Sequence, residues 1–93
     1  MHRYRISVEA LGEADREGGT LVFEVENHDD ILNIAERIAA GSVLPKEEAA
    51  EFAIGLKLFS EVLIRHRREP LFVEMFEALT LFMKRLKTEV AKG

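Results

Sequence analysis

No cysteine occurs in this sequence of 93 residues. The chain therefore has no disulfide framework, no thiolate zinc site and no thiol nucleophile. It also lacks any apolar run near the roughly 20 residues of a membrane-spanning helix, and its first ten residues, MHRYRISVEA, contain no signal-peptide core. Apolar residues make up 47% and charged residues 32%, as in a folded globular domain. We expect a single cytoplasmic domain over residues 1–93, without membrane contact.

An excess of positive charge is missing as well, since the formal net charge is −4. Residues 1–51 hold 12 acidic and 5 basic side chains, a net charge of −7, whereas residues 52–93 hold 5 acidic and 8 basic ones, a net charge of +3. Domains that bind nucleic acid usually carry a strongly basic surface. We therefore do not expect nucleic acid as a partner.

Signatures of catalysis and of cofactor binding are absent. Ser60 and Thr80 have no Gly-x-Ser-x-Gly context that would mark a nucleophile. Gly18 and Gly19 precede a predicted strand, whereas glycines that hold phosphates precede a helix. The sequence therefore predicts no cofactor and favours a protein that is not an enzyme.

Two segments, residues 3–10 and 20–26, alternate apolar and polar side chains with the period of two that is typical of half-buried strands. The predicted inner side chains are Tyr4, Ile6, Val8 and Ala10, and then Leu21, Phe23 and Val25. Val22 is an apolar residue on the outer side. The polar, glycine-containing connection 11–19 predicts an antiparallel hairpin with a mobile loop.

The apolar period changes to that of helices from Ile31 onward. We predict helices over about 28–40, 45–68 and 70–90, with Gly41 ending the first and Pro70 interrupting the chain before the third. The order ββααα defines an α+β domain. The short connection at Pro70 favours an antiparallel pair of the second and third helices.

The second helix is apolar on two adjacent faces, so we expect it to be the most buried. The aromatic residues at helical spacing are expected in the core, although the last of them lies off the main stripe of its helix: Phe52, Phe59, Phe72, Phe76 and Phe82. Gly55 costs about 1 kcal/mol relative to alanine inside a helix. We therefore expect a neighbour packed closely against Gly55.

The segment FEVENHDDIL, residues 23–32, has two interpretations. In the first, Asn27 is the N-cap of the first helix, the following aspartates interact with the helix dipole, and His28 is exposed. In the second, Glu26, His28 and Asp30 hold a metal ion or act in acid–base chemistry. The second needs an extended chain as far as Asp30, which the helical period from Ile31 opposes. The sequence favours the cap.

Residues 64–70, IRHRREP, form the strongest basic cluster. Arg65, His66, Arg67 and Arg68 could bind an anion or an acidic partner. Cations in the last turn of a helix also interact favourably with the free carbonyls and the dipole. The sequence favours this helix-capping interpretation over an anionic partner.

Three stretches, YRISVE, FEVENHDDILNIAERI and GLKLFSEVLIRHRREPLF, resemble a small bacterial family of uncharacterised single-domain proteins, a domain of unknown function. The resemblance covers nearly the whole chain and is weakest across 11–19 and the last ten residues. It implies one compact ββααα domain and assigns no catalytic or ligand-binding residue.

Two functional hypotheses remain. The first is a non-catalytic interaction or structural protein that forms a homodimer, because a two-stranded sheet leaves two open edges and because Val22 and Phe82 lie on the outer sides of their elements. The second is a domain that binds a small ligand, an anion or a metal ion through residues 24–30 or 65–68. The sequence favours the homodimer.

Overall fold

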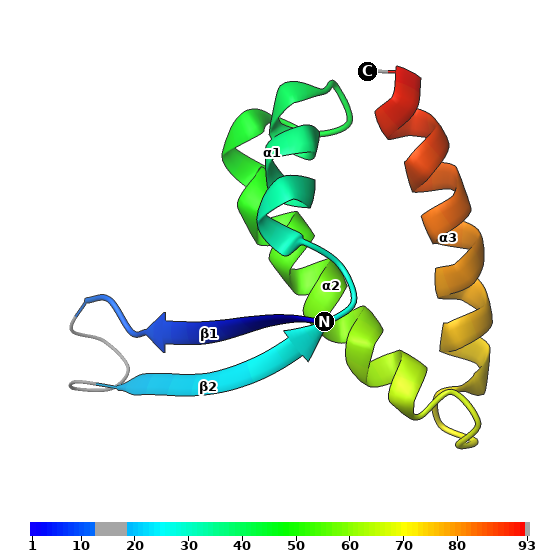
Figure 1. Cartoon of the computed structure of the whole chain (residues 1–93), viewed down its shortest axis with the longest axis horizontal. Helices are drawn as coiled ribbons and strands as arrows, with labels where there is room; N and C mark the ends of the chain where they lie inside the picture. Colours follow the sequence, from blue (N-terminus) through cyan, green and yellow to red (C-terminus); the bar gives the residue numbers. More distant parts are fainter. Residues whose placement is uncertain (13–18, 93) are drawn as a thin grey trace.

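The computed structural model describes residues 1–12 and 19–92. It contains a two-stranded antiparallel sheet followed by three helices (Figure 1). This confirms the predicted α+β order ββααα. Residues 13–18, most of the connection predicted to be mobile, lie outside the described part of the chain.

The strands β1 (His2–Glu9) and β2 (Thr20–Asn27) form a hairpin, which we call the arm. Opposite residues in an antiparallel pair share a face of the sheet, and the register pairs Tyr4 with Val25, Ile6 with Phe23 and Val8 with Leu21. These six side chains therefore make one apolar face of the arm, the arm face. Val22 lies opposite Ser7, on the other face.

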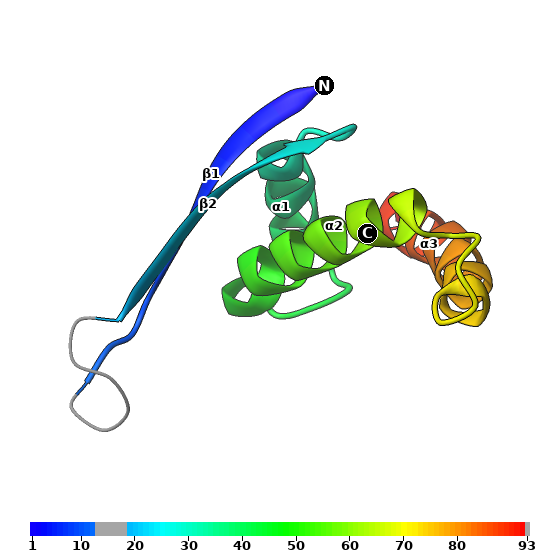
Figure 2. The ribbon, with the colours of Figure 1, turned by 90° about the horizontal axis from the view of Figure 1, so that it is seen from below.

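The arm extends away from the helices (Figures 1 and 2). At its root, the Tyr4 hydroxyl donates to the Asp29 carbonyl at 3.3 Å and accepts from the Ile31 N–H at 2.9 Å. Toward its tip, Val8 is 56% exposed and Leu21 is 62% exposed. The prediction that these residues point into a core is wrong, because no helix in the described part of the chain reaches the outer half of the arm.

The first helix, α1 (Ile31–Ala40), begins three residues later than predicted. Asp30 is its N-cap, with a side-chain oxygen that accepts from the Asn33 N–H at 3.1 Å. The helix ends before Gly41, as predicted, and the Gly41 N–H donates to the Ile38 carbonyl. Its apolar side packs against the following helix, with Ile31 and Ile38 buried.

The chain then forms a 3₁₀ helix (Lys46–Glu48), α2 (Ala49–Arg65), a turn that contains Pro70, and α3 (Val73–Lys92). Helices α2 and α3 run in opposite directions and form a V (Figure 1). The rings of Phe52 and Phe82 meet edge-to-face between them, with centroids 6.3 Å apart. No helix in the described part of the chain is long and apolar enough to cross a membrane.

The core is small and consists mainly of aliphatic side chains. Ile38, Ala49 and Ala53 form its centre, where the small alanines allow α1 to approach α2 closely. As predicted, α2 is the most buried helix. The prediction that Phe59 lies in the core is wrong, because Phe59 is 47% exposed. Phe52, Phe72 and Phe76 are half-buried. Phe82, which lies off the main stripe of its helix, is 43% exposed.

The expected close packing at Gly55 is also wrong. A Cβ atom built at Gly55 meets no atom within 4 Å outside its own helix backbone. The residue faces open space on the outer side of α2.

Candidate functional site

The segment between β2 and α1, residues 27–30, is held by side chains from α2. Asn27 is 2% exposed, and its amide donates to the Lys57 carbonyl at 3.0 Å. Its side-chain oxygen accepts from the Asp29 N–H, also at 3.0 Å. The prediction that Asn27 is the helix cap is therefore wrong, because Asn27 anchors the end of β2 to α2 and Asp30 caps the helix.

His28 pairs with Glu61, 33 positions later in the chain. Its ring Nδ1 lies 2.9 Å from Oε2 of Glu61, and its backbone N–H donates to Oε1 at 3.1 Å. An ionised carboxylate can only accept hydrogen bonds, so Nδ1 carries the proton in this contact. The His28 side chain is 65% exposed, whereas the Glu61 side chain is only 10% exposed. The ring thus covers a carboxylate that is nearly buried.

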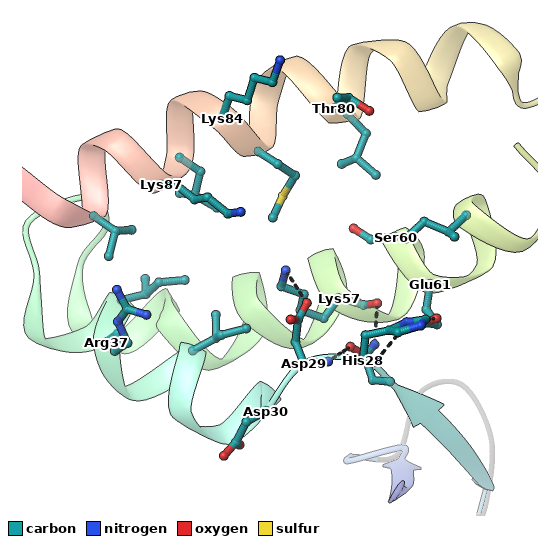
Figure 3. A pocket seen from close by; sticks show the side chains of 18 of the residues that line it. His28, Asp29, Asp30, Arg37, Lys57, Ser60, Glu61, Thr80, Lys84 and Lys87 are labelled. Carbon is teal, nitrogen blue, oxygen red and sulfur yellow. Dashed lines mark hydrogen bonds and ion pairs between the residues drawn. The ribbon is translucent and has the colours of Figure 1, made fainter. Parts of the chain in front are cut away.

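A second ion pair joins the same two segments. The Lys57 ammonium lies 3.0 Å from Oδ2 of Asp29 (Figure 3). Only 10% of the Lys57 side chain is exposed, whereas half of the Asp29 side chain is. A nearly buried ammonium needs a partner to offset its loss of hydration. Asp29 therefore supplies the negative charge that Lys57 on α2 requires.

The candidate metal ligands Glu26, His28 and Asp30 have different surroundings. Glu26 lies on β2 opposite Arg3, His28 pairs with Glu61, and Asp30 caps α1. Figure 3 shows the Asp30 carboxylate pointing away from His28. Among residues 1–12 and 19–92, no group of three histidine, aspartate or glutamate side chains is placed to hold a metal ion.

A cleft of about 880 Å³ lies between α3 on one side and α1 and α2 on the other (Figure 3). Its α3 wall has an apolar part, formed by Phe76, Leu79, Met83, Leu86 and Val90, and a polar part, formed by Thr80, Lys84 and Lys87. The His28–Glu61 and Lys57–Asp29 pairs stand at its floor. Arg37 from α1 also lines the cleft, and Lys87 from α3 points into it (Figure 3). The cleft therefore combines an apolar wall with a basic margin.

The basic cluster of residues 65–68 lies at the turn after α2. The Arg67 guanidinium donates to the Ile64 carbonyl at 2.9 Å, which is the helix-capping contact expected there. His66 pairs with Glu69. Arg65, His66, Arg67, Arg68 and Glu69 together line a shallow hollow of about 250 Å³.

Sequence reasoning missed Lys57, Ser60 and Glu61 as members of this region. They follow Ala49 and Ala53 at spacings of three and four, so all five lie on one side of α2. The available signal was that polar residues follow two alanines on the same side of the helix. This pattern indicates that one side of α2 makes an apolar contact near its start and a buried polar contact farther along.

The family model of DUF3861, described as a domain of unknown function with a solved structure, matches residues 2–88. A crystal structure of a protein of unknown function from Pectobacterium atrosepticum is similar to the chain, with 36% sequence identity and a TM-score of 0.81. The similarity covers 94% of this chain and 97% of that one. No curated protein matches the chain.

Proposed function

The chain belongs to the DUF3861 family, whose function is unknown, and from this premise we propose that it is a non-catalytic interaction protein that works as a homodimer. The observation that carries the proposal is the exposed outer half of the arm face. Val8, Leu21 and Phe23 are 56%, 62% and 37% exposed, side by side on one face of a projecting hairpin. A continuous apolar patch of this kind on a soluble domain marks a surface that a partner covers.

The size of the exposed surface supports this proposal. The accessible area is 7353 Å², whereas a compact monomer of 10.6 kDa exposes about 5,500 Å². The excess of about 1,900 Å² is within the area that one subunit loses in an obligate homodimer, roughly 1,000–2,500 Å². The radius of gyration, 15.2 Å, likewise exceeds the about 12 Å of a compact chain of this length.

The hydrogen bonding of the buried polar side chains supports a role without catalysis. Each buried side-chain nitrogen or oxygen of the described residues has a hydrogen-bond partner. His28, Glu61, Lys57 and Asp29 satisfy one another, and their contacts join β2 to α2. A structural role accounts for this arrangement. The lack of cysteine suits a reducing compartment, and we include the cytoplasm in the proposal.

Sedimentation velocity at micromolar concentration tests the homodimer. We expect a species of twice 10.6 kDa for the wild-type chain. Leu21→Asp should dissociate it, because the new carboxylate would lie in an apolar interface. Leu32→Asp is the matched control, since Leu32 lies on α1 and is 64% exposed, against 62% for Leu21. A wild-type chain that remains at 10.6 kDa up to 100 µM would refute the proposal.

An anion-binding domain is the second candidate, favoured by the hollow beside Arg65 and Arg68. A ligand that binds only the folded state raises its melting temperature. This alternative therefore predicts that inorganic phosphate stabilises the wild-type chain and that Arg68→Gln removes the effect. Equal shifts in both proteins would reflect a general salt effect and would leave no support for an anion site.

A further inference from the structure

We propose that the homodimer forms by reciprocal arm exchange, in which the arm face of each copy covers the cleft between α3 and α1–α2 of the other. This inference rests on the proposed homodimer and names its two contacting surfaces. The outer half of the arm face is exposed, and the cleft beside α3 is lined by half-buried apolar side chains and is open in the single chain. When two copies exchange arms, the arm of each copy covers the cleft of the other, so that both surfaces are buried in both copies.

The arm cannot cover the cleft of its own chain. In both views it extends from one side of α2 while α3 lies on the other (Figures 1 and 2). Its root is fixed by the Tyr4 hydroxyl bonds to residues 29 and 31 and by the buried Asn27. The exposed outer half therefore has to find its cover on a second molecule.

The outer half of the arm fits within the cleft wall. Four residues of a strand span about 13 Å, and the wall side chains from Phe76 to Val90 extend over about 21 Å of helix. The exposed outer half of the arm can therefore lie along this wall, with its side chains entering the cleft.

The charged side chains of the arm lie away from the proposed contact. Arg3, Arg5, Glu9, Glu24 and Glu26 are on the face of the hairpin opposite the arm face, and Arg3 and Arg5 both pair with Glu24. Inserting the arm face into the cleft therefore buries none of these charges, whose burial would cost free energy in an apolar contact.

Symmetry also favours this exchange. Each copy has one arm and one cleft, so two copies related by a two-fold axis use every such surface once and leave none for a third. A one-directional insertion would continue into a filament. The two-fold arrangement therefore predicts a dimer that does not grow further.

Cross-linking can locate the contact, because the chain has no cysteine of its own. We would prepare Leu21→Cys on the arm, Met83→Cys in the cleft wall and Leu81→Cys as a control. Leu81 is 55% exposed on α3 and does not line the cleft. Each is treated with a short bifunctional maleimide, alone and in pairwise mixtures after subunit exchange.

Arm exchange predicts covalent dimers in the mixture of Leu21→Cys and Met83→Cys, at least about tenfold more than in either alone or in mixtures with Leu81→Cys. Dimers from Leu21→Cys alone would show arm-to-arm contact and overturn the inference. Dimers from Met83→Cys alone would show α3-to-α3 contact and also overturn it. Either result keeps the proposed homodimer, whereas a chain that sediments at 10.6 kDa removes both proposals.

Complementation gives an independent readout. Phe23→Asp damages the arm and Met83→Asp damages the cleft, and each alone should weaken the dimer about 100-fold. A heterodimer of the two contains one intact arm in one intact cleft, so mixing should restore dimers. Val22→Asp, on the opposite face of β2, should leave the dimer intact. Mixed damaged subunits that remain monomeric would contradict arm exchange.

Discussion

Glu61 binds His28 twice, through the ring Nδ1 at 2.9 Å and through the backbone N–H at 3.1 Å. The pair joins the end of β2 to the middle of α2 across 33 positions. Because the Glu61 side chain is nearly buried and the His28 ring is mostly exposed, the two side chains contribute unequally to the stability of the fold. The carboxylate holds the backbone in place, and the ring shields the carboxylate from water.

Glu61→Ala should therefore destabilise the fold by about 1–3 kcal/mol, because the His28 N–H loses its acceptor. Glu61→Gln retains an acceptor and should cost less. His28→Ala keeps the backbone bond and should cost below about 1 kcal/mol. Urea unfolding at a fixed protein concentration measures all three. A larger loss for His28→Ala than for Glu61→Ala would reverse this assignment.

Asn27 and Asp30 have different roles, which substitutions can separate. Asp30→Ala should cost about 0.5–2 kcal/mol through the lost cap, whereas Asp30→Asn should be nearly neutral, since asparagine caps equally well. Asn27→Asp should be strongly destabilising, because it replaces the donor to the Lys57 carbonyl with a buried charge. Thermal melts of the three variants test the order. Similar losses for Asp30→Asn and Asn27→Asp would contradict it.

Two glycines should respond in opposite ways to alanine. Gly55→Ala should stabilise the chain by about 1 kcal/mol, because a Cβ meets no atom there and alanine favours the helix. Gly12→Ala should destabilise it, because Gly12 has a φ of +92° that alanine adopts only with strain. Melting temperatures measured side by side check the signs. A loss of stability in Gly55→Ala would indicate that a second copy packs against that side of α2.

The core can be tested by truncating one buried and one exposed side chain of α2. Leu63 is 1% exposed, so Leu63→Ala should cost about 2–5 kcal/mol. Phe59 is 47% exposed, and Phe59→Ala should cost clearly less. Chemical denaturation measures the difference. Equal costs would place Phe59 in an interface that the single chain does not show.

Local signals predicted most of the fold. The period of two before residue 27, the period of helices from Ile31, Gly41 and Pro70 identified the five elements in their order. The cap was ambiguous because Asn27 and Asp30 are both preferred cap residues three positions apart. Only tertiary contact with the Lys57 carbonyl decides that Asn27 is buried.

The candidate region was predicted only in part, because its partners come from different parts of the sequence. Glu61 and Lys57 are charged residues on a helix, and charged residues are usually exposed. Nothing local identifies them as partners of His28 and Asp29. The prediction that Phe59 is buried was wrong for a similar reason: helical spacing shows that Phe59 lies on an apolar stripe, but it does not determine how far apart two helices lie.

The root of the arm has a mechanical consequence. Tyr4 and Asn27 fix the hairpin where it meets the helices, and no helix of the described residues supports the outer halves of β1 and β2. The arm is therefore a lever of about 26 Å, and a rotation of about 10° at its root moves its tip by roughly 5 Å. Small changes among a few hydrogen bonds at the root thus set the direction in which the two strands point.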